Sequence, residues 1–164
     1  MKSLFLLRHA KSSWDNPQHS DFERPLSKRG ISDAVLLSKY IQKHSISFDL
    51  ILSSPSERTQ STLDLVSSSL NPIPSTVFKE SIYHASASAL SQLIKEQDEE
   101  INNVLVIGHN PGLHILTESL TDESIIKFPT CAFAKLTNFN HWKDLDAGIL
   151  NFELLITPRE LKHD

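Results

Sequence analysis

Four short apolar runs along the chain predict buried β-strands. Three of them are continuous, "SLFLL" (3–7), "FDLILS" (48–53) and "NVLVIG" (103–108), and a weaker one is "STVFK" (75–79). Runs of this length without polar alternation are typical of strands that are covered on both faces, as in a parallel sheet. We therefore expect these segments to form the centre of a parallel sheet.

Between the apolar runs, hydrophobic residues recur at the three- and four-residue spacing of amphipathic helices. The pattern occurs four times, at Ile31, Ala34, Leu37 and Ile41, at Leu63, Val66 and Leu70, at Leu90, Leu93 and Ile94, and at Leu113, Leu116 and Leu120. Alternation of strands and helices predicts an α/β fold, a three-layer sandwich whose mostly parallel central sheet carries helices on both faces. Two alternating segments near the end, "CAFAKLTNF" and "GILNFELLI", predict strands at a sheet edge.

Two helix starts carry capping signals. In "SPSE", Ser54 is the expected N-cap, Pro55 the first helical residue and Glu57 the partner that closes a capping box. In "NPG", Asn110 is the expected N-cap and Pro111 the first helical residue.

Length and composition place the chain among ordinary globular proteins. No repeat, linker or low-complexity tract interrupts the 164 residues, which we expect to form one domain over 1–164. The net charge of −4 argues against a general nucleic-acid binder. Cys131 is the only cysteine, which rules out an internal disulfide and favours a reducing compartment.

Hydrophobic runs give no sign of membrane targeting. None approaches the roughly 18–20 residues that cross a bilayer, and the N-terminal run Leu4–Leu7 is shorter than the core of a signal peptide. We therefore expect a cytoplasmic protein without a membrane partner. Because no long apolar stripe is left over, we expect a monomer.

Candidate chemistry gathers where the predicted strands end. Arg8 and His9 directly follow the first strand, Arg58 lies in the first turn of the helix after the second, and His109 follows "NVLVIG". In open α/β sheets, ligands bind at the carboxyl ends of parallel strands. Guanidinium groups match tetrahedral oxyanions, and helix N-termini add N–H donors, so the expected site binds phosphate.

The sequence lacks the motifs of other phosphatase classes and of common cofactor-binding sites. A cysteine nucleophile requires an arginine six residues later, but Thr137 stands at that distance from Cys131. The chain has neither a P-loop nor a dinucleotide fingerprint. Its eight histidines show no His-x-x-x-His pair, so we expect neither a metal nor another cofactor.

Three motifs in order, "LLRHAKSSW", "RPL" and "SSPSERTQST", followed by "VLVIGHNPG", resemble the histidine phosphatase superfamily, which includes the cofactor-dependent phosphoglycerate mutases. The compact branch of SixA-type phosphohistidine phosphatases is the most similar. The resemblance implies a phosphoglycerate-mutase-like fold in which His9 is the nucleophile that becomes phosphorylated. It also implies that Arg8, Arg58 and His109 form the phosphate pocket, joined by Arg24 in the SixA-type branch.

The sequence departs from the family pattern at the proton donor. Some members carry His-Asp at the second histidine, whereas this chain has His109-Asn110. Mutase-like members carry a glutamate after the third strand; the matching position here is His84, with Glu80 as a competitor. The donor is therefore His84, Glu80 or neither.

The expected activity is a metal-independent phosphohydrolase acting through a phosphohistidine intermediate. Alkyl phosphates need a protonated leaving group, whereas imidazole leaves phosphorus easily near neutral pH. Without a carboxylate donor, a phosphohistidine protein is the favoured substrate. Hydrolysis of small phosphoesters, or recognition of phosphate without turnover, are the alternatives.

Overall fold

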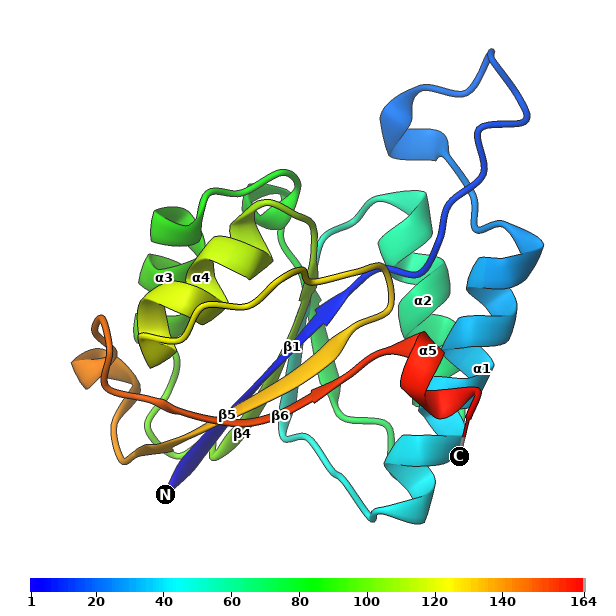
Figure 1. The fold of residues 1–164 in the computed structure, drawn as a ribbon. Helices are drawn as coiled ribbons and strands as arrows, with labels where there is room; N and C mark the ends of the chain where they lie inside the picture. The colour runs from blue at the N-terminus through cyan, green and yellow to red at the C-terminus, as the bar shows by residue number, and fades with distance from the viewer. Residues whose placement is uncertain (164) are drawn as a thin grey trace.

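A computed structural model describes residues 1–163, which form a six-stranded sheet flanked by helices (Figure 1). The strands are β1 (Lys2–Arg8), β2 (Leu50–Ser53), β3 (Ser75–Phe78), β4 (Asn103–Gly108), β5 (Phe133–Phe139) and β6 (Asn151–Ile156). The α-helices are α1 (Lys28–Lys43), α2 (Glu57–Ser67), α3 (Ala87–Lys95), α4 (Gly112–Thr121) and α5 (Pro158–Leu161). Short 3₁₀ turns are η1 (Asp21–Glu23), η2 (Glu80–Ile82) and η3 (Trp142–Asp144).

The sheet has the order β3-β2-β4-β1-β5-β6. Strand β4 pairs in parallel with β1 and β2, and β2 pairs in parallel with β3. Strand β5 runs antiparallel to both β1 and β6, so the two late strands extend one side of the sheet. The predicted α/β class, with a mostly parallel sheet and two added strands at one edge, is confirmed.

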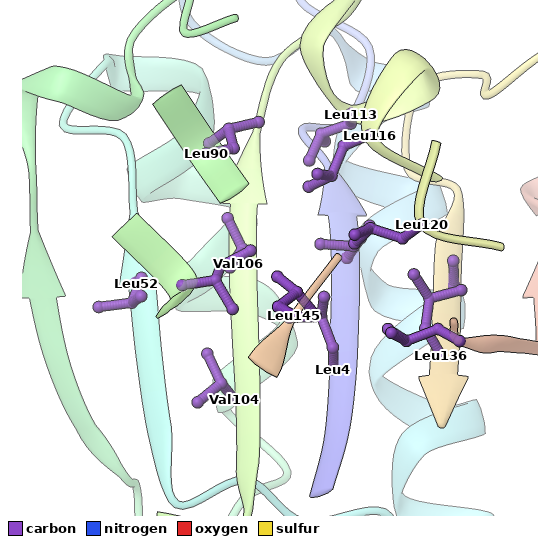
Figure 2. Close-up of a cluster of buried hydrophobic side chains, with 14 of the residues drawn as sticks. Leu4, Leu52, Leu90, Val104, Val106, Leu113, Leu116, Leu120, Leu136 and Leu145 are labelled. Atoms are coloured by element: carbon purple, nitrogen blue, oxygen red, sulfur yellow. The ribbon is translucent and has the colours of Figure 1, made fainter. Parts of the chain in front are cut away.

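Alternate side chains of the central strands fill two cores, one on each face of the sheet. Leu4 of β1 packs with Val104 and Val106 of β4 against residues of α3 and α4 (Figure 2), and Leu6 belongs to the same cluster. Residues of opposite parity, such as Phe5, pack against α1 and α2 on the other face, where α5 also lies (Figure 1). Burial on both faces explains why these strands are continuous apolar runs.

Both expected helix starts are displaced toward the C-terminus. Helix α2 begins at Glu57 with Ser56 as its N-cap, and the Ser54 hydroxyl instead contacts the His109 ring, with 2.8 Å between Oγ and Nε2. Helix α4 begins at Gly112, and Pro111 rather than Asn110 takes the N-cap position. The Asn110 side chain still accepts a hydrogen bond from the His114 amide at 3.3 Å. Asn110 therefore bonds to the first turn as predicted, but the helix begins one residue later than predicted.

Three other sequence expectations need correction. Ile31 is 46% exposed, because the buried stripe of α1 runs through Gly30 and Ala34 instead. Leu70 lies beyond the end of α2. The second strand begins at Leu50 rather than residue 48, since the Asp49 carboxylate accepts hydrogen bonds from the amides at the start of β4.

No helix within residues 1–163 is long and apolar enough to cross a membrane.

Gly30 allows α1 to approach the segment that follows the first strand. A β-carbon at this position would lie 2.1 Å from the Lys11 carbonyl oxygen. The same oxygen accepts hydrogen bonds from the amide and hydroxyl of Ser27, the N-cap of α1, at 2.9 and 3.1 Å. The carbonyl therefore cannot move away without loss of both bonds.

We predict that Gly30→Ala lowers the free energy of unfolding by about 1–3 kcal/mol, because the methyl group is forced against the backbone. This loss occurs although alanine is the better helix former by about 1 kcal/mol. Urea denaturation measures the change, and Ser32→Ala, at an exposed position of the same helix, is the matched control. Equal stability of the two variants would contradict the close approach.

Candidate active site

Two histidines a hundred positions apart meet at the carboxyl ends of neighbouring strands. Arg8 pairs with Gly108 in the register of β1 and β4, so the next residues, His9 and His109, leave adjacent strands at the same level. Their ring centroids are 5.3 Å apart. The parallel register therefore brings the two imidazoles together, as the sequence predicted.

The His9 ring is held in the tautomer that has no hydrogen on Nε2. Nδ1 lies 2.8 Å from the Ala10 carbonyl oxygen and must carry the hydrogen, because a carbonyl only accepts. Nε2 accepts a hydrogen bond from Arg58 Nε at 3.4 Å. Burial lowers the pKa of His9 to about 3, and the charges of Arg58, Arg8 and Arg24 add to this effect against the opposing Ala10 hydrogen bond. His9 is thus a neutral imidazole with the Nε2 lone pair facing the site.

His109 has the opposite tautomer. A guanidinium only donates, so Nδ1, which lies 3.4 Å from Arg58 Nη2, is the acceptor. Nε2 then carries the hydrogen that it donates to Ser54 Oγ. Burial is the largest cause that lowers the pKa of His109, to about 3. The charges of His9, Arg58 and His84 also lower this pKa, whereas the charge of Asp21 raises it. Both rings are therefore neutral at physiological pH.

Arg58 faces both histidines with one edge and is fixed by its other edge. It lies in the first turn of α2 and is almost fully buried. On the outer side, Nη1 donates to the Asp21 carbonyl oxygen at 2.6 Å, and Nη2 donates to the Asp21 carboxylate at 3.0 Å. These two contacts fix the plane of the guanidinium and direct Nε toward His9.

Asp21, which the sequence analysis did not single out, is the common partner of this cluster. Its carboxylate accepts hydrogen bonds from Arg24 Nη1 at 3.0 Å, from His84 Nε2 at 3.0 Å and from the Tyr83 hydroxyl. Partial burial favours the protonated form, but the hydrogen bonds from Tyr83, His84, Arg58 and Arg24 outweigh it and hold the pKa of Asp21 well below its ordinary value. Asp21 is thus an anion held between the guanidinium groups of Arg24 and Arg58.

Arg24 joins the cluster through Asp21 rather than through the histidines. Its Nη2 donates to the Ser12 hydroxyl and its Nε to the Ser13 carbonyl oxygen at 3.3 Å. The exposed Trp14 ring stacks on the guanidinium, with its centroid 3.2 Å from the central carbon. Arg24 therefore ties the segment that follows His9 to η1.

Arg8 presents a donor without a protein partner. Nη1 donates to the Phe128 carbonyl oxygen at 3.1 Å. Nε is buried and has no hydrogen-bond partner among the described residues. Burial, and next the charge of Arg58, lower the pKa of Arg8. A buried cationic donor left open in this way is suited to an anion that enters the site.

His84 lies at the rim of the cluster, where the structure places it against both His109 and Asp21. Its ring centroid is 5.0 Å from that of His109, and about half of its side chain is exposed. Its backbone has a φ of 53°, in the left-handed region that few residues other than glycine adopt. Its competitor Glu80 is exposed at the start of η2.

The arrangement can bind a tetrahedral anion and present it to a neutral imidazole. Among the described residues, no group of three or more His, Cys, Asp or Glu side chains is placed to hold a metal ion. The Cys131 thiol is buried, which, together with the charge of Asp33, raises its pKa to about 12, so no thiolate nucleophile forms there.

Comparison with known proteins identifies relatives of the whole chain. An uncharacterized chloroplastic protein of Arabidopsis thaliana is 33% identical over 171 residues, which span 96% of this chain and 78% of that protein. The phosphohistidine phosphatase SixA of Escherichia coli (strain K12) is 28% identical over 137 residues, 82% of this chain and 84% of that protein.

A solved structure of the protein histidine phosphatase SixA complexed with tungstate superposes with a TM-score of 0.83 at 25% identity, covering 97% of this chain and 99% of that one. The model of the histidine phosphatase superfamily (branch 1) matches residues 4–82, which include the first histidine and all three arginines of the cluster. The chain therefore belongs to branch 1 of the histidine phosphatase superfamily.

Proposed function

We propose that the protein is a phosphohydrolase that transfers the phosphoryl group of a phosphohistidine protein first to His9 and then to water. The observation that carries the proposal is the state of the His9 ring. Its Nδ1 is bound to the Ala10 carbonyl oxygen, so Nε2 offers a lone pair within the cluster of arginines. A phosphate-binding module would need the arginines but not a nucleophile prepared in this way.

In the first step, His9 Nε2 attacks phosphorus in line. The new N–P bond forms while the bond from phosphorus to the substrate imidazole breaks, and the leaving ring keeps the electron pair and takes a proton. We propose that Arg8 Nε, which has no partner among the described residues, and Arg58 Nε, which gives up its hydrogen bond to His9 Nε2 in this step, bind the phosphoryl oxygens, on which the transition state carries its charge. Water then attacks the phosphohistidine, releasing inorganic phosphate and the free His9 ring.

His109 is proposed to take up a proton when phosphate binds. In the free protein its Nδ1 is an acceptor facing Arg58, and burial, followed by the charges of neighbouring groups, disfavours the charged ring and lowers its pKa. A phosphate dianion replaces this repulsion with attraction, which raises the pKa of His109. Protonated at Nδ1, the ring becomes a further hydrogen-bond donor to the phosphoryl group.

His84 is proposed as the group that exchanges the proton with the leaving group. Its Nε2 donates to Asp21, so Nδ1 is the nitrogen open to proton transfer at the rim. A phosphohistidine substrate needs only a weak proton donor, because the leaving imidazole is easily protonated near neutral pH. The relation to SixA of Escherichia coli supports the same class of substrate.

We predict that His9→Ala reduces turnover of a phosphohistidine peptide by roughly 10³-fold or more, because the variant lacks the proposed nucleophile. In wild-type protein, EDTA leaves the rate unchanged, and a radiolabelled phosphodonor gives an acid-labile, base-stable label on His9. Label on serine would refute the nucleophile, chelator-sensitive turnover would indicate a metal hydrolase, and faster hydrolysis of alkyl phosphates would favour small phosphoesters as substrates.

We predict that neither His9 nor His109 gains a proton in the free protein between about pH 5 and 8, because both have depressed pKa values. NMR of histidine-labelled protein measures this, with assignments from His9→Gln and His109→Gln. Adding inorganic phosphate should raise the midpoint of His109. A midpoint of about 6.5 in the free protein, the ordinary value, would contradict the assignment of neutral rings.

We predict that Asp21→Ala lowers kcat by roughly 10²-fold with a smaller change in KM, because Arg58 loses the carboxylate that fixes its plane. Asp21→Glu should restore part of the rate. Asp15→Ala, at an exposed position of the same loop, is the control and should match the wild type. An unchanged kcat in Asp21→Ala would show that Arg58 keeps its orientation without this partner.

A further inference from the structure

A basic cleft lies on the flank of the molecule, against the segment that leads into β5. The cleft measures about 320 Å³, and its cationic side chains are Arg29 of α1, Lys127 of the segment before β5, and Arg159 and Lys162 in and after α5. His163 also lines it. Three parts of the chain that are far apart in sequence thus contribute positive charge to one hollow, although the protein as a whole carries a net charge of −4.

The charge of the basic cleft is only partly neutralised. Asp33 is fully buried, and its carboxylate lies 3.0 Å from Lys162 Nζ and 3.6 Å from Arg29 Nε. Lys127 and Arg159 form no ion pair with any carboxylate of residues 1–163. None of the described residues that line the cleft is acidic, so the buried Asp33 carboxylate, which pairs with two of the four cations, leaves an excess of positive charge.

The exposure of these cations indicates the kind of partner. The Arg29 side chain is 65% exposed and that of Lys162 is 44% exposed, whereas Arg58 in the candidate active site is almost fully buried. Exposed charges attract over distance and adapt their positions, which suits acidic side chains on a flexible chain. A site for a single small anion would instead need buried, fixed donors like those around His9.

One wall of the basic cleft is joined directly to the candidate active site. Lys127 and Pro129 line the cleft, and the carbonyl oxygen of Phe128 between them accepts hydrogen bonds from Arg8 at 3.1 Å and Asn110 at 2.7 Å. The amide of Cys131 donates to the carbonyl oxygens of Arg8 and His9 at 3.0 Å. The backbone segment that forms this wall of the basic cleft is therefore bonded directly to the strand end that carries His9.

We propose that the basic cleft binds an acidic stretch of the protein substrate that lies next to its phosphorylated side chain. The proposal rests on the proposed function, because it assigns the protein substrate a second contact outside the phosphate pocket. Binding there raises the association rate for substrates with flanking Asp and Glu residues and leaves the chemical step at His9 unchanged.

Two phosphohistidine peptides of equal length, one with flanking Asp and Glu residues and one with Gly and Ser, test the proposal. At low salt, kcat/KM of the wild type should favour the acidic peptide by about tenfold, and high salt should remove the preference. The double variant Lys127→Glu/Arg159→Glu should lose the preference but keep its activity toward a small aryl phosphate. Lys39→Glu/Lys43→Glu, with the same change of net charge further along α1, is the control and should keep the preference.

Equal rates for the two peptides in the wild type, or a preference that survives in Lys127→Glu/Arg159→Glu, would overturn the proposal. So would an equal loss in the control variant, since the effect would then come from overall charge. If charge reversal disturbs folding, Lys127→Gln/Arg159→Gln provides the same comparison.

A binding measurement separates this proposal from the proposed function. His9→Ala protein should bind the fluorescently labelled acidic peptide about tenfold more tightly than the Gly and Ser peptide, by fluorescence anisotropy. Failure of wild-type turnover on both peptides would refute the proposed function, whereas equal anisotropy affinities would refute the basic cleft as a docking surface.

Discussion

The contact between Arg58 and the two histidines is the interaction on which the site depends. A guanidinium can be placed against two imidazoles only while both rings are neutral, and its own orientation requires a fixed acceptor behind it. The Asp21 carbonyl and carboxylate supply that acceptor. Arg58 is thus held by an anion on the side away from the rings, so that its inner donors stay directed at the two histidines.

Burial and positive charge act in the same direction on the histidines. Each disfavours the imidazolium form, and together they keep the pKa of both His9 and His109 at about 3. The proposed nucleophile, His9, therefore stays unprotonated among the arginines, where a carboxylate or thiolate would instead form ion pairs. A phosphate dianion, the proposed ligand, would relieve the repulsion among these groups.

Much of the fold and part of the site could be predicted because they follow from periodic patterns. The apolar runs at 3–7 and 103–108 identified the two central strands, and the residues that follow them identified the two histidines. The strand at 75–78 was the weakest signal because it lies at an edge of the sheet and is largely exposed. Edge strands bury too little surface to leave a clear apolar pattern.

Asp21 escaped prediction for a different reason. It lies in a loop without periodicity, and a negative charge is not expected in a phosphate pocket. The "DFER" segment does carry a signal, an acidic residue three positions before a cation already assigned to the site. The prediction of Ser54 as an N-cap was wrong for a related reason. A serine before a proline matches the sequence of a helix cap, whether its hydroxyl bonds to the helix or to a ring that is distant in sequence.

The pairing of β1 with β4 sets a limit on how this site can change. Both histidines occupy the first position after a strand, so a single-residue insertion within either strand would turn one ring to the opposite face of the sheet. The lengths of the connecting loops do not alter this register, although the loop between β1 and α1 must still bring Asp21 to Arg58. Insertions and deletions are therefore expected in the loops around the two histidines and not in the strands beneath them, so the surroundings of the site can diverge while the pair of imidazoles stays in place.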